Sequence, residues 1–165
     1  VAAYFISLLL SDLIQAIGSI LNARWICDMA VIVGDVCTLQ GILKQTADIA
    51  TAFWTLVIAI HTFCLICLGL KSSRFTLWMT LIAVWSGIGA IVIAGPAAQS
   101  TPRHEPFYGI SGFWCWISPE YATSRIMYMF MAAAFSFVLY TLVFLRMRRA
   151  ARRARHGHGR HFDRT

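Results

Sequence analysis

Polar side chains inside the most apolar stretches of this chain are the residues whose chemistry needs explaining. Asp12, Gln15 and Ser19 follow one another at spacings of three and four residues within the apolar stretch at 1–21, which puts them on one face of a helix. A charge in the middle of a bilayer costs several kcal/mol, so this face should look into a protein interior. Two interpretations stay open: a buried hydrogen-bonded network without a ligand, or a cation or proton site that responds to activation.

A second polar group lies in the next apolar stretch. Lys44 and Asp48 are spaced i, i+4 and can pair on a helix, and Thr51 and Thr55 continue the same face one and two turns further along. Counting back from Lys71 along a helix at about 1.5 Å per residue puts the charged pair near the outer mouth of a bundle. The charges are either interfacial side chains that reach toward water or the floor of an outward-facing pocket. These four residues are therefore candidate ligand contacts.

The elements that must position these residues are long and apolar. The chain has 165 residues, of which 59% are hydrophobic and 13% charged, and its mean hydropathy is +0.69. A soluble domain carries about a quarter charged residues, so this composition indicates lipid as the solvent. About 20 mostly apolar residues cross the hydrocarbon. We predict an all-α, polytopic transmembrane bundle with spans at about 1–21, 37–70, 75–98 and 118–147, the last one beginning at Ser118-Pro119.

Basic residues predict the orientation of the spans. Lys71 and Arg74 lie in the short loop between the second and third spans, and eight of the 14 Lys and Arg residues lie between Arg146 and Arg164. Both sites fall on one side of the membrane if all four spans insert, and the positive-inside rule makes that side cytoplasmic. The prediction is a multi-pass membrane protein with a transmembrane core at 1–149, a basic cytoplasmic segment at 150–165 and membrane lipid as a partner.

Cysteine positions predict a disulfide on the opposite side. Cys37 lies at the outer tip of the second span and Cys115 in the long outer loop, so a bridge between them would tie the loop to a helix. Cys27 lies on the same side and offers a competing pairing. Cys64 and Cys67 lie near the cytoplasmic end and are predicted to be free thiols.

Patterns typical of catalysis are not found in the sequence. It lacks a Gly-rich phosphate loop, an H-E-x-x-H motif and a Ser/His/Asp set with a shared location, so we predict no enzyme and no cofactor. His156, His158 and His161 stand without a Cys or carboxylate cluster, so we predict no metal site. The Arg-rich tail directly follows a membrane span, and we predict no nucleic-acid partner.

The order of these features resembles a known family of receptors. The carrying residues are Cys37 at the start of the second span, Trp85 in the third, and the segments Ser11-Asp12-Leu13, Ala59-Ile-His-Thr-Phe63 and Gly112-Phe-Trp-Cys-Trp-Ile117. Up to about Arg149, the chain resembles helices two to five of the cyclic-AMP-receptor-like seven-helix receptors, including the glucose-sensing receptors of fungi. Ile60-His-Thr-Phe-Cys64 stands where rhodopsin-like receptors carry Asp-Arg-Tyr, so the resemblance is not to that class.

The resemblance implies a G-protein-coupled receptor in the plasma membrane that senses an extracellular small molecule or nutrient and signals to a heterotrimeric G protein. It also implies the Cys37–Cys115 bridge and ligand contacts near Lys44 and Asp48. The four spans would then be part of a seven-helix protein. Other interpretations are a four-span membrane scaffold protein and a transporter fragment. The residues expected to face the G protein are Lys71, Arg74, Arg146, Arg148 and Arg149.

Overall fold

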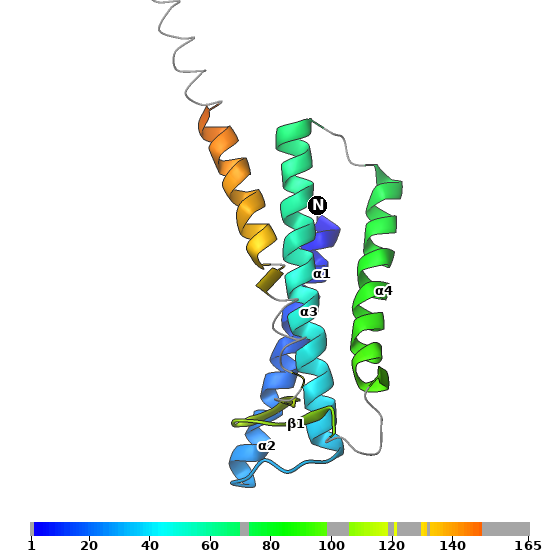
Figure 1. Cartoon of the computed structure of the whole chain (residues 1–165), viewed down its shortest axis with the longest axis vertical. Helices are drawn as coiled ribbons and strands as arrows, with labels where there is room; N and C mark the ends of the chain where they lie inside the picture. Colours follow the sequence, from blue (N-terminus) through cyan, green and yellow to red (C-terminus); the bar gives the residue numbers. More distant parts are fainter. Residues whose placement is uncertain are drawn as a thin grey trace, which may run out of the picture.

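One long helix is the axis of the molecule, and the other elements pack around it (Figure 1). The computed structural model describes residues 2–69, 73–98, 106–118, 121, 130–131 and 133–149. The axis is α3, continued by the π-helical turn η1. Residues 133–149 are also helical. The elements are α1 (Ala2–Ile20), α2 (Asn22–Cys27), α3 (Asp35–Phe63), η1 (Cys64–Leu68), α4 (Arg74–Ala98), β1 (Tyr108–Ser111) and β2 (Trp114–Ile117).

The helices have the length and the surface of membrane spans. Among the described residues, three segments are long and apolar enough to cross a bilayer: Ala2–Cys27, Asp35–Ile66 and Arg74–Ala97. Large apolar side chains cover their outer faces, and Ile93 is 71% exposed. Such a surface is unfavourable in water and suits lipid. The chain is therefore an all-α polytopic bundle, as predicted, and the predicted start of the fourth span falls mostly outside the described residues.

Local chemistry sets the helix ends near the loop between the second and third spans. The Ser73 hydroxyl accepts the Thr76 backbone N–H at 3.1 Å, which caps the first turn of α4. Gly69 adopts φ 66°, a left-handed conformation that ends η1 without steric cost. We call this end of the bundle the inner end and the opposite end, where α3 begins at Asp35, the outer end, following the predicted orientation.

Small residues let α1 and α3 approach closely. Ser7, Ser11 and Gly18 are the small buried residues of α1, which packs against α3. An added Cβ at Gly18 would meet Leu43 and Lys44 of α3 at 3.4 Å. Close backbone approach through small side chains is a common way to pack helices in lipid. The Ser11 hydroxyl donates to the Ser7 carbonyl in its own helix at 2.9 Å, so it needs no partner from another helix.

An aromatic cluster fills the inner half of the bundle. Trp54 of α3 is fully buried and lies between Tyr4 of α1 and Trp85 of α4, with ring centroids 6.0 and 5.9 Å away. His61 packs edge-on to Tyr4 at 5.3 Å. The cluster joins three helices with rigid side chains that bury large areas.

The outer end has local structure that the sequence analysis did not predict. Strands β1 and β2 pair antiparallel, with Tyr108 opposite Ile117, and Gly112 at φ 74° makes the turn. The loop between α1 and α3, which also lies at the outer end, contains the short helix α2. The start of the fourth span at Ser118-Pro119 stays a prediction. The Ser118 N–H donates to the Phe107 carbonyl, its hydroxyl donates to the Pro106 carbonyl, and its own carbonyl accepts from the Tyr121 N–H.

Candidate functional site

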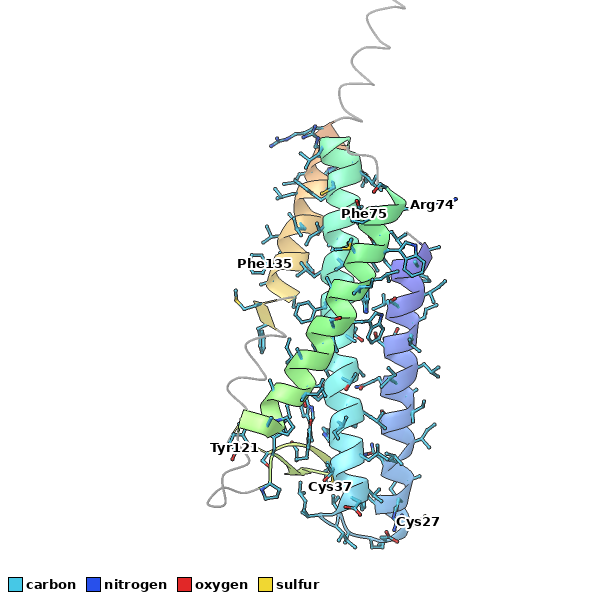
Figure 2. All side chains as sticks on the ribbon, turned by 90° about the vertical axis from the view of Figure 1, so that its right-hand side faces the viewer. Cys27, Cys37, Arg74, Phe75, Tyr121 and Phe135 are labelled. Atoms are coloured by element: carbon cyan, nitrogen blue, oxygen red, sulfur yellow. A yellow bond between two sulfur atoms is a disulfide. The ribbon has the colours of Figure 1, made fainter. Side chains whose placement is uncertain are left out.

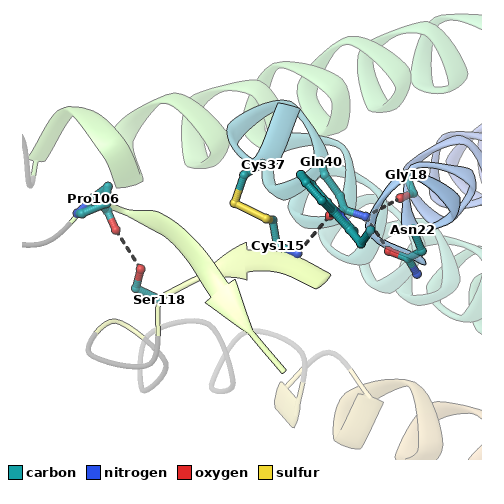
Figure 3. Close-up of a disulfide and its surroundings, with 8 residues drawn as sticks. Gly18, Asn22, Cys37, Gln40, Pro106, Cys115 and Ser118 are labelled. Carbon is teal, nitrogen blue, oxygen red and sulfur yellow. Dashed lines mark hydrogen bonds between the residues drawn. A yellow bond between two sulfur atoms is a disulfide. The ribbon is translucent and has the colours of Figure 1, made fainter. Parts of the chain in front are cut away.

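A disulfide fastens the β-hairpin to the outer end of α3. Cys37 in the first turn of α3 is bonded to Cys115 of β2, and both residues are fully buried (Figure 3). Trp25 of α2 packs against the bridge. This is the pair that the sequence favoured over one with Cys27, which is an exposed free thiol in the structure. The disulfide therefore holds the hairpin covalently against the outer end of α3.

Gln40 lies about one turn further along α3 than Cys37, and both the oxygen and the nitrogen of its side-chain amide make hydrogen bonds. Its Oε1 accepts from Trp25 Nε1 at 2.8 Å and from the Cys115 backbone N–H at 2.9 Å. Its Nε2 donates to the Gly18 carbonyl at 3.1 Å and to Asn22 Oδ1 (Figure 3). The side chain is fully buried, so all its hydrogen-bonding capacity is used inside the protein.

The sequence analysis did not single out Gln40. The signal that could have found it is a neutral amide placed one helical turn after the cysteine at the outer tip of a span. Such a side chain in lipid needs partners from neighbouring segments.

A second polar contact holds β1 against α3. The Tyr108 hydroxyl donates to Gln45 Oε1, and both side chains are buried. Burial raises the pKa of Tyr108 from its ordinary value of 10.0 to about 12, so the phenol keeps its proton. The ring lies over Gly41, where an added Cβ would come within 2.5 Å of Tyr108 Cδ1. Glycine at this position therefore permits the contact.

Lys44 lies at the junction between the hairpin and α1. Its Nζ is 3.4 Å from Ser19 Oγ and 5.5 Å from the centre of the Trp114 ring. The Ser19 hydroxyl in turn donates to the Gln15 carbonyl. The predicted outer position of Lys44 thus corresponds to contact with the hairpin. Its predicted pairing with Asp48 stays a prediction, and the contact described for Asp48 is with Gln15.

Below this junction three helices border an open cleft of about 340 Å³, which we call the polar cavity after its Asp, Gln, Thr and Ser residues, although most of its surface is apolar. It lies between α1, α3 and the helix at 133–149. Asp48 is about 20 Å along α3 from Asp35, so the cavity is well inside the span. The lining residues are Asp12, Gln15, Asp48, Thr51, Ala52, Thr55, Ala133 and Ser136.

The polar cavity brings together two groups that the sequence analysis treated separately. Asp12 and Gln15 come from the predicted polar face of the first span, and Asp48, Thr51 and Thr55 come from the candidate ligand residues. Gln15 Nε2 donates to Asp48 Oδ1 at 3.3 Å and links the two helices. Two predicted residues do not line the cavity, because Ser19 and Lys44 contact each other closer to the hairpin.

Ser136 is the lining residue that the sequence analysis missed. It is 6% exposed, and its Oγ has no hydrogen-bond partner among the described residues. The buried Oε1 of Gln15 is likewise without a described partner. A lone serine in an otherwise apolar span was the available signal, because serine there either bonds its own helix or faces a polar neighbour.

Basic residues gather at the inner end. Arg74 begins α4, and Figure 2 shows it at the same end of the bundle as the final turns of the helix at 133–149. Those turns carry Arg146, Arg148 and Arg149, and the Arg148 guanidinium lies 5.4 Å from the centre of the Phe144 ring. Lys71, the remaining residue of the predicted set, lies outside the described residues.

Comparison with known proteins finds receptors. The ascaroside receptor GPR2 of Arthrobotrys oligospora is 26% identical over 161 residues, which cover 91% of this chain and 36% of that receptor. G-protein coupled receptor 157 of Homo sapiens and that of Mus musculus are each 27% identical over 124 residues, or 72% of this chain. No family model and no solved structure matches the chain.

The chain is similar to G-protein-coupled receptors. It spans about a third of the length of the curated relatives it matches, 36% of the first two. These relatives are receptors and not enzymes by their names. The polytopic helices and the bonded cysteines describe a membrane protein, and the proteins to which it is similar are receptors.

Proposed function

We propose that the chain forms helices two to five of a seven-helix receptor of the cyclic-AMP-receptor-like kind. The receptor senses an extracellular small molecule or nutrient and activates a heterotrimeric G protein. The support is the similarity to an ascaroside receptor and to G-protein coupled receptor 157, together with the arrangement of the two bundle ends. Its location is the plasma membrane, where a ligand outside and a G protein inside can both reach it.

The observation that carries the proposal is the polar cavity below a covalently held hairpin. Three helices supply its walls, and their polar groups come from Asp12, Gln15, Asp48, the two threonines and Ser136. Small-molecule sites are concave and carry a few convergent polar groups, and they occur between the helices of bundles. Lys44 is a candidate contact on the outer side, where a ligand would pass the Trp114 ring.

Binding between helices gives a simple route to signalling. A ligand that contacts α1, α3 and the helix at 133–149 favours whichever packing of these helices suits it best, and it shifts the equilibrium by its difference in affinity for the two packings. The helix at 133–149 has Ser136 at the cavity and Arg146, Arg148 and Arg149 near its inner end. A change at the cavity therefore moves the surface offered to the G protein.

Nucleotide exchange on G proteins tests this function without knowledge of the ligand. We expect the full-length protein, expressed in cells, to raise basal exchange on at least one heterotrimeric G protein in isolated membranes. The variant Arg146→Ala/Arg148→Ala/Arg149→Ala should return exchange to the level of untransfected membranes. Arg24→Ala is the control, because Arg24 is exposed on α2 at the outer end and should not affect exchange.

Surface expression of each variant is measured in the same cells, so that loss of protein is not mistaken for loss of coupling. The proposal fails if no G-protein family responds to the full-length protein, or if the triple arginine variant couples as well as the parent.

A further inference from the structure

Four exposed arginines from two elements gather at the inner end of the bundle, on either side of α3 (Figure 1). They are Arg74, Arg146, Arg148 and Arg149, which we call the arginine collar. The sequence holds no Asp or Glu from 49 to 104 or from 121 to 162, so α4 and the helix at 133–149 carry no carboxylate side chain. The collar is therefore a surface of one sign of charge, and it suits an anionic partner.

The last turns of the helix at 133–149 lie across the boundary between the acyl chains and the lipid headgroups. Phe144, Leu145 and Met147 are exposed and alternate with the arginines of the collar. Exposed apolar side chains on a membrane span face the acyl chains, whereas a charged group is costly away from the membrane surface. Because both kinds of side chain come from the same two turns, the guanidinium groups lie at the level of the lipid phosphates.

Arg148 is turned back toward the membrane. Its guanidinium lies 5.4 Å from the centre of the Phe144 ring, and Phe144 is four residues earlier in the helix. Helical side chains lean toward the N-terminus of their helix, which here leads into the bilayer, and four residues take up about 6 Å of helix. The attraction between the cation and the ring favours this position. A lipid phosphate can reach the charge there more readily than a protein that docks from the cytosol.

We propose that the arginine collar binds the headgroups of anionic phospholipids in the inner leaflet, with Phe144 holding the Arg148 guanidinium at the depth of the lipid phosphate. The planar guanidinium donates two parallel hydrogen bonds to phosphate oxygens. The cytoplasmic leaflet is rich in anionic phospholipids, and one basic residue near such a surface strengthens association by about fivefold. The inference goes beyond the proposed receptor function and does not depend on it.

Selection between two lipids tests the proposal without a G protein. The full-length protein is placed in nanodiscs that contain equal parts of phosphatidylserine, which is anionic, and phosphatidylcholine, which is neutral overall. Native mass spectrometry then identifies the first lipid that stays bound when the protein is released. We expect the ratio of phosphatidylserine to phosphatidylcholine to be about five or more at low salt. The ratio should fall as the salt concentration rises, because salt screens exposed charges.

Removal of charge shows whether the collar makes this selection. Arg146→Gln/Arg148→Gln/Arg149→Gln should bring the ratio close to one. Arg152→Gln/Arg153→Gln/Arg155→Gln removes the same charge from the basic segment that follows and is the matched control. The control should retain a clearly higher ratio than the collar variant, because its three arginines lie beyond the collar in the sequence.

A change at constant net charge tests the part played by Phe144. Phe144→Leu keeps an apolar side chain but removes the ring beside Arg148, and it should lower the ratio by about twofold or more. Phe137→Leu is its control, because Phe137 is exposed on the same helix about two turns earlier and should leave the ratio unchanged.

A ratio near one in the parent, or equal ratios in the collar variant and its control, would overturn the inference. An unchanged ratio in Phe144→Leu would overturn it as well, and this variant decides the matter if the triple variant does not fold. The exchange assay separates the two proposals. Loss of exchange in the triple arginine variant, with a ratio near one in the parent, would make the G protein and not lipid the partner of the collar. Selection of phosphatidylserine without exchange would leave a lipid site in a protein that is not a receptor.

Discussion

Tyr108 shows how one side chain ties a surface loop to a membrane helix. Its phenol is 5% exposed and donates a hydrogen bond to Gln45 Oε1 of α3. Burial raises its pKa to about 12, since the charged form would lose its hydration. Over the pH range of cells, the hydroxyl therefore remains a donor, and the contact does not depend on pH.

Strongly alkaline solution should break this contact. The pKa of Tyr108 is raised in the folded state above the unfolded value of 10.0, so its stabilising effect is complete below pH 10 and is lost as the pH rises through about 12. We expect the Tm of the purified protein in nanodiscs to fall across this window. Tyr108→Phe should lower Tm below pH 10 and should remove part of the alkaline fall.

Tyr140→Phe is the control for this titration, because Tyr140 is 42% exposed on the last helix and should leave the alkaline fall intact. A Tyr108→Phe profile that runs parallel to the parent's over the whole pH range would contradict the prediction.

At the scale of the elements, the hairpin packs closely against α3 because the residue of α3 at the contact is a glycine and has no side chain. Gly41 is buried in α3, and the Tyr108 ring occupies the place where a side chain would stand. Gly87 in α4 has nothing within 4 Å of its own missing Cβ. Glycine therefore has a packing role at one position and none that the structure shows at the other.

Replacing each of these two glycines by alanine should change the free energy of unfolding differently. Gly41→Ala should lower the free energy of unfolding by about 1–3 kcal/mol, because the new Cβ would lie 2.5 Å from Tyr108 Cδ1 and must push the ring away. Gly87→Ala should be neutral or stabilise by about 0.5–1 kcal/mol, because alanine is the better helix former. Thermal unfolding in the same nanodiscs measures both, and equal Tm values for the two variants would refute this account.

Some of these elements can be predicted from the sequence and others cannot. The long helices depend on their own local sequence, whereas the hairpin and α2 depend on contacts with residues far away in the chain. Hydrocarbon length and apolar composition are properties of a segment by itself, so the sequence could predict a bundle of long apolar helices, and three such helices are described. The hairpin depends on a bond between Cys37 and Cys115, 78 residues apart, and on contacts with α3. Helix α2 is short and holds Trp25 against Gln40. Nothing local in the loop sequence indicates these distant partners.

The candidate site was predicted in its parts but not as a whole. Helical spacing put Asp12 and Gln15 on one face, and Asp48, Thr51 and Thr55 on another, and these five residues line the polar cavity. That the two faces meet depends on the packing of α1 against α3 through small residues, which spacing within one helix does not report. The contribution of the helix at 133–149 requires the chain to return across the outer end. The sequence could therefore show Ser136 as a lone serine in an apolar span, but not its place at this site.

At the scale of the whole molecule, Gln40 is the point where α1, α2, α3 and the hairpin are joined. Its partners are Gly18, Asn22, Trp25 and Cys115. The disulfide links only the hairpin and α3, whereas the amide also sets the position of α1 and α2 against both. Because a buried amide is satisfied only when all these groups are in place, it favours one arrangement of the outer end over looser ones.

Gln40→Leu should therefore destabilise the protein more than loss of one hydrogen bond would. Leucine fills a similar volume but leaves Trp25 Nε1 and the Cys115 N–H unpaired, and each buried unpaired group costs about 1–3 kcal/mol. We expect the free energy of unfolding to fall by roughly 2–5 kcal/mol. Gln40→Glu retains the acceptor but sets a second carboxylate oxygen against the Gly18 carbonyl and Asn22 Oδ1 in a fully buried place, so it should also destabilise the protein.

A double-mutant cycle with Trp25→Phe separates the loss of the hydrogen bond between Gln40 and Trp25 from simple loss of packing. Phenylalanine lacks the indole N–H, so in its presence Gln40→Leu no longer strands that donor, and the two losses should be less than additive by about 0.5–3 kcal/mol. Thermal unfolding of the parent, both single variants and the double variant in nanodiscs gives the coupling. Strict additivity would mean that Gln40 and Trp25 act independently, and the outer end would then be held by the disulfide rather than by the amide.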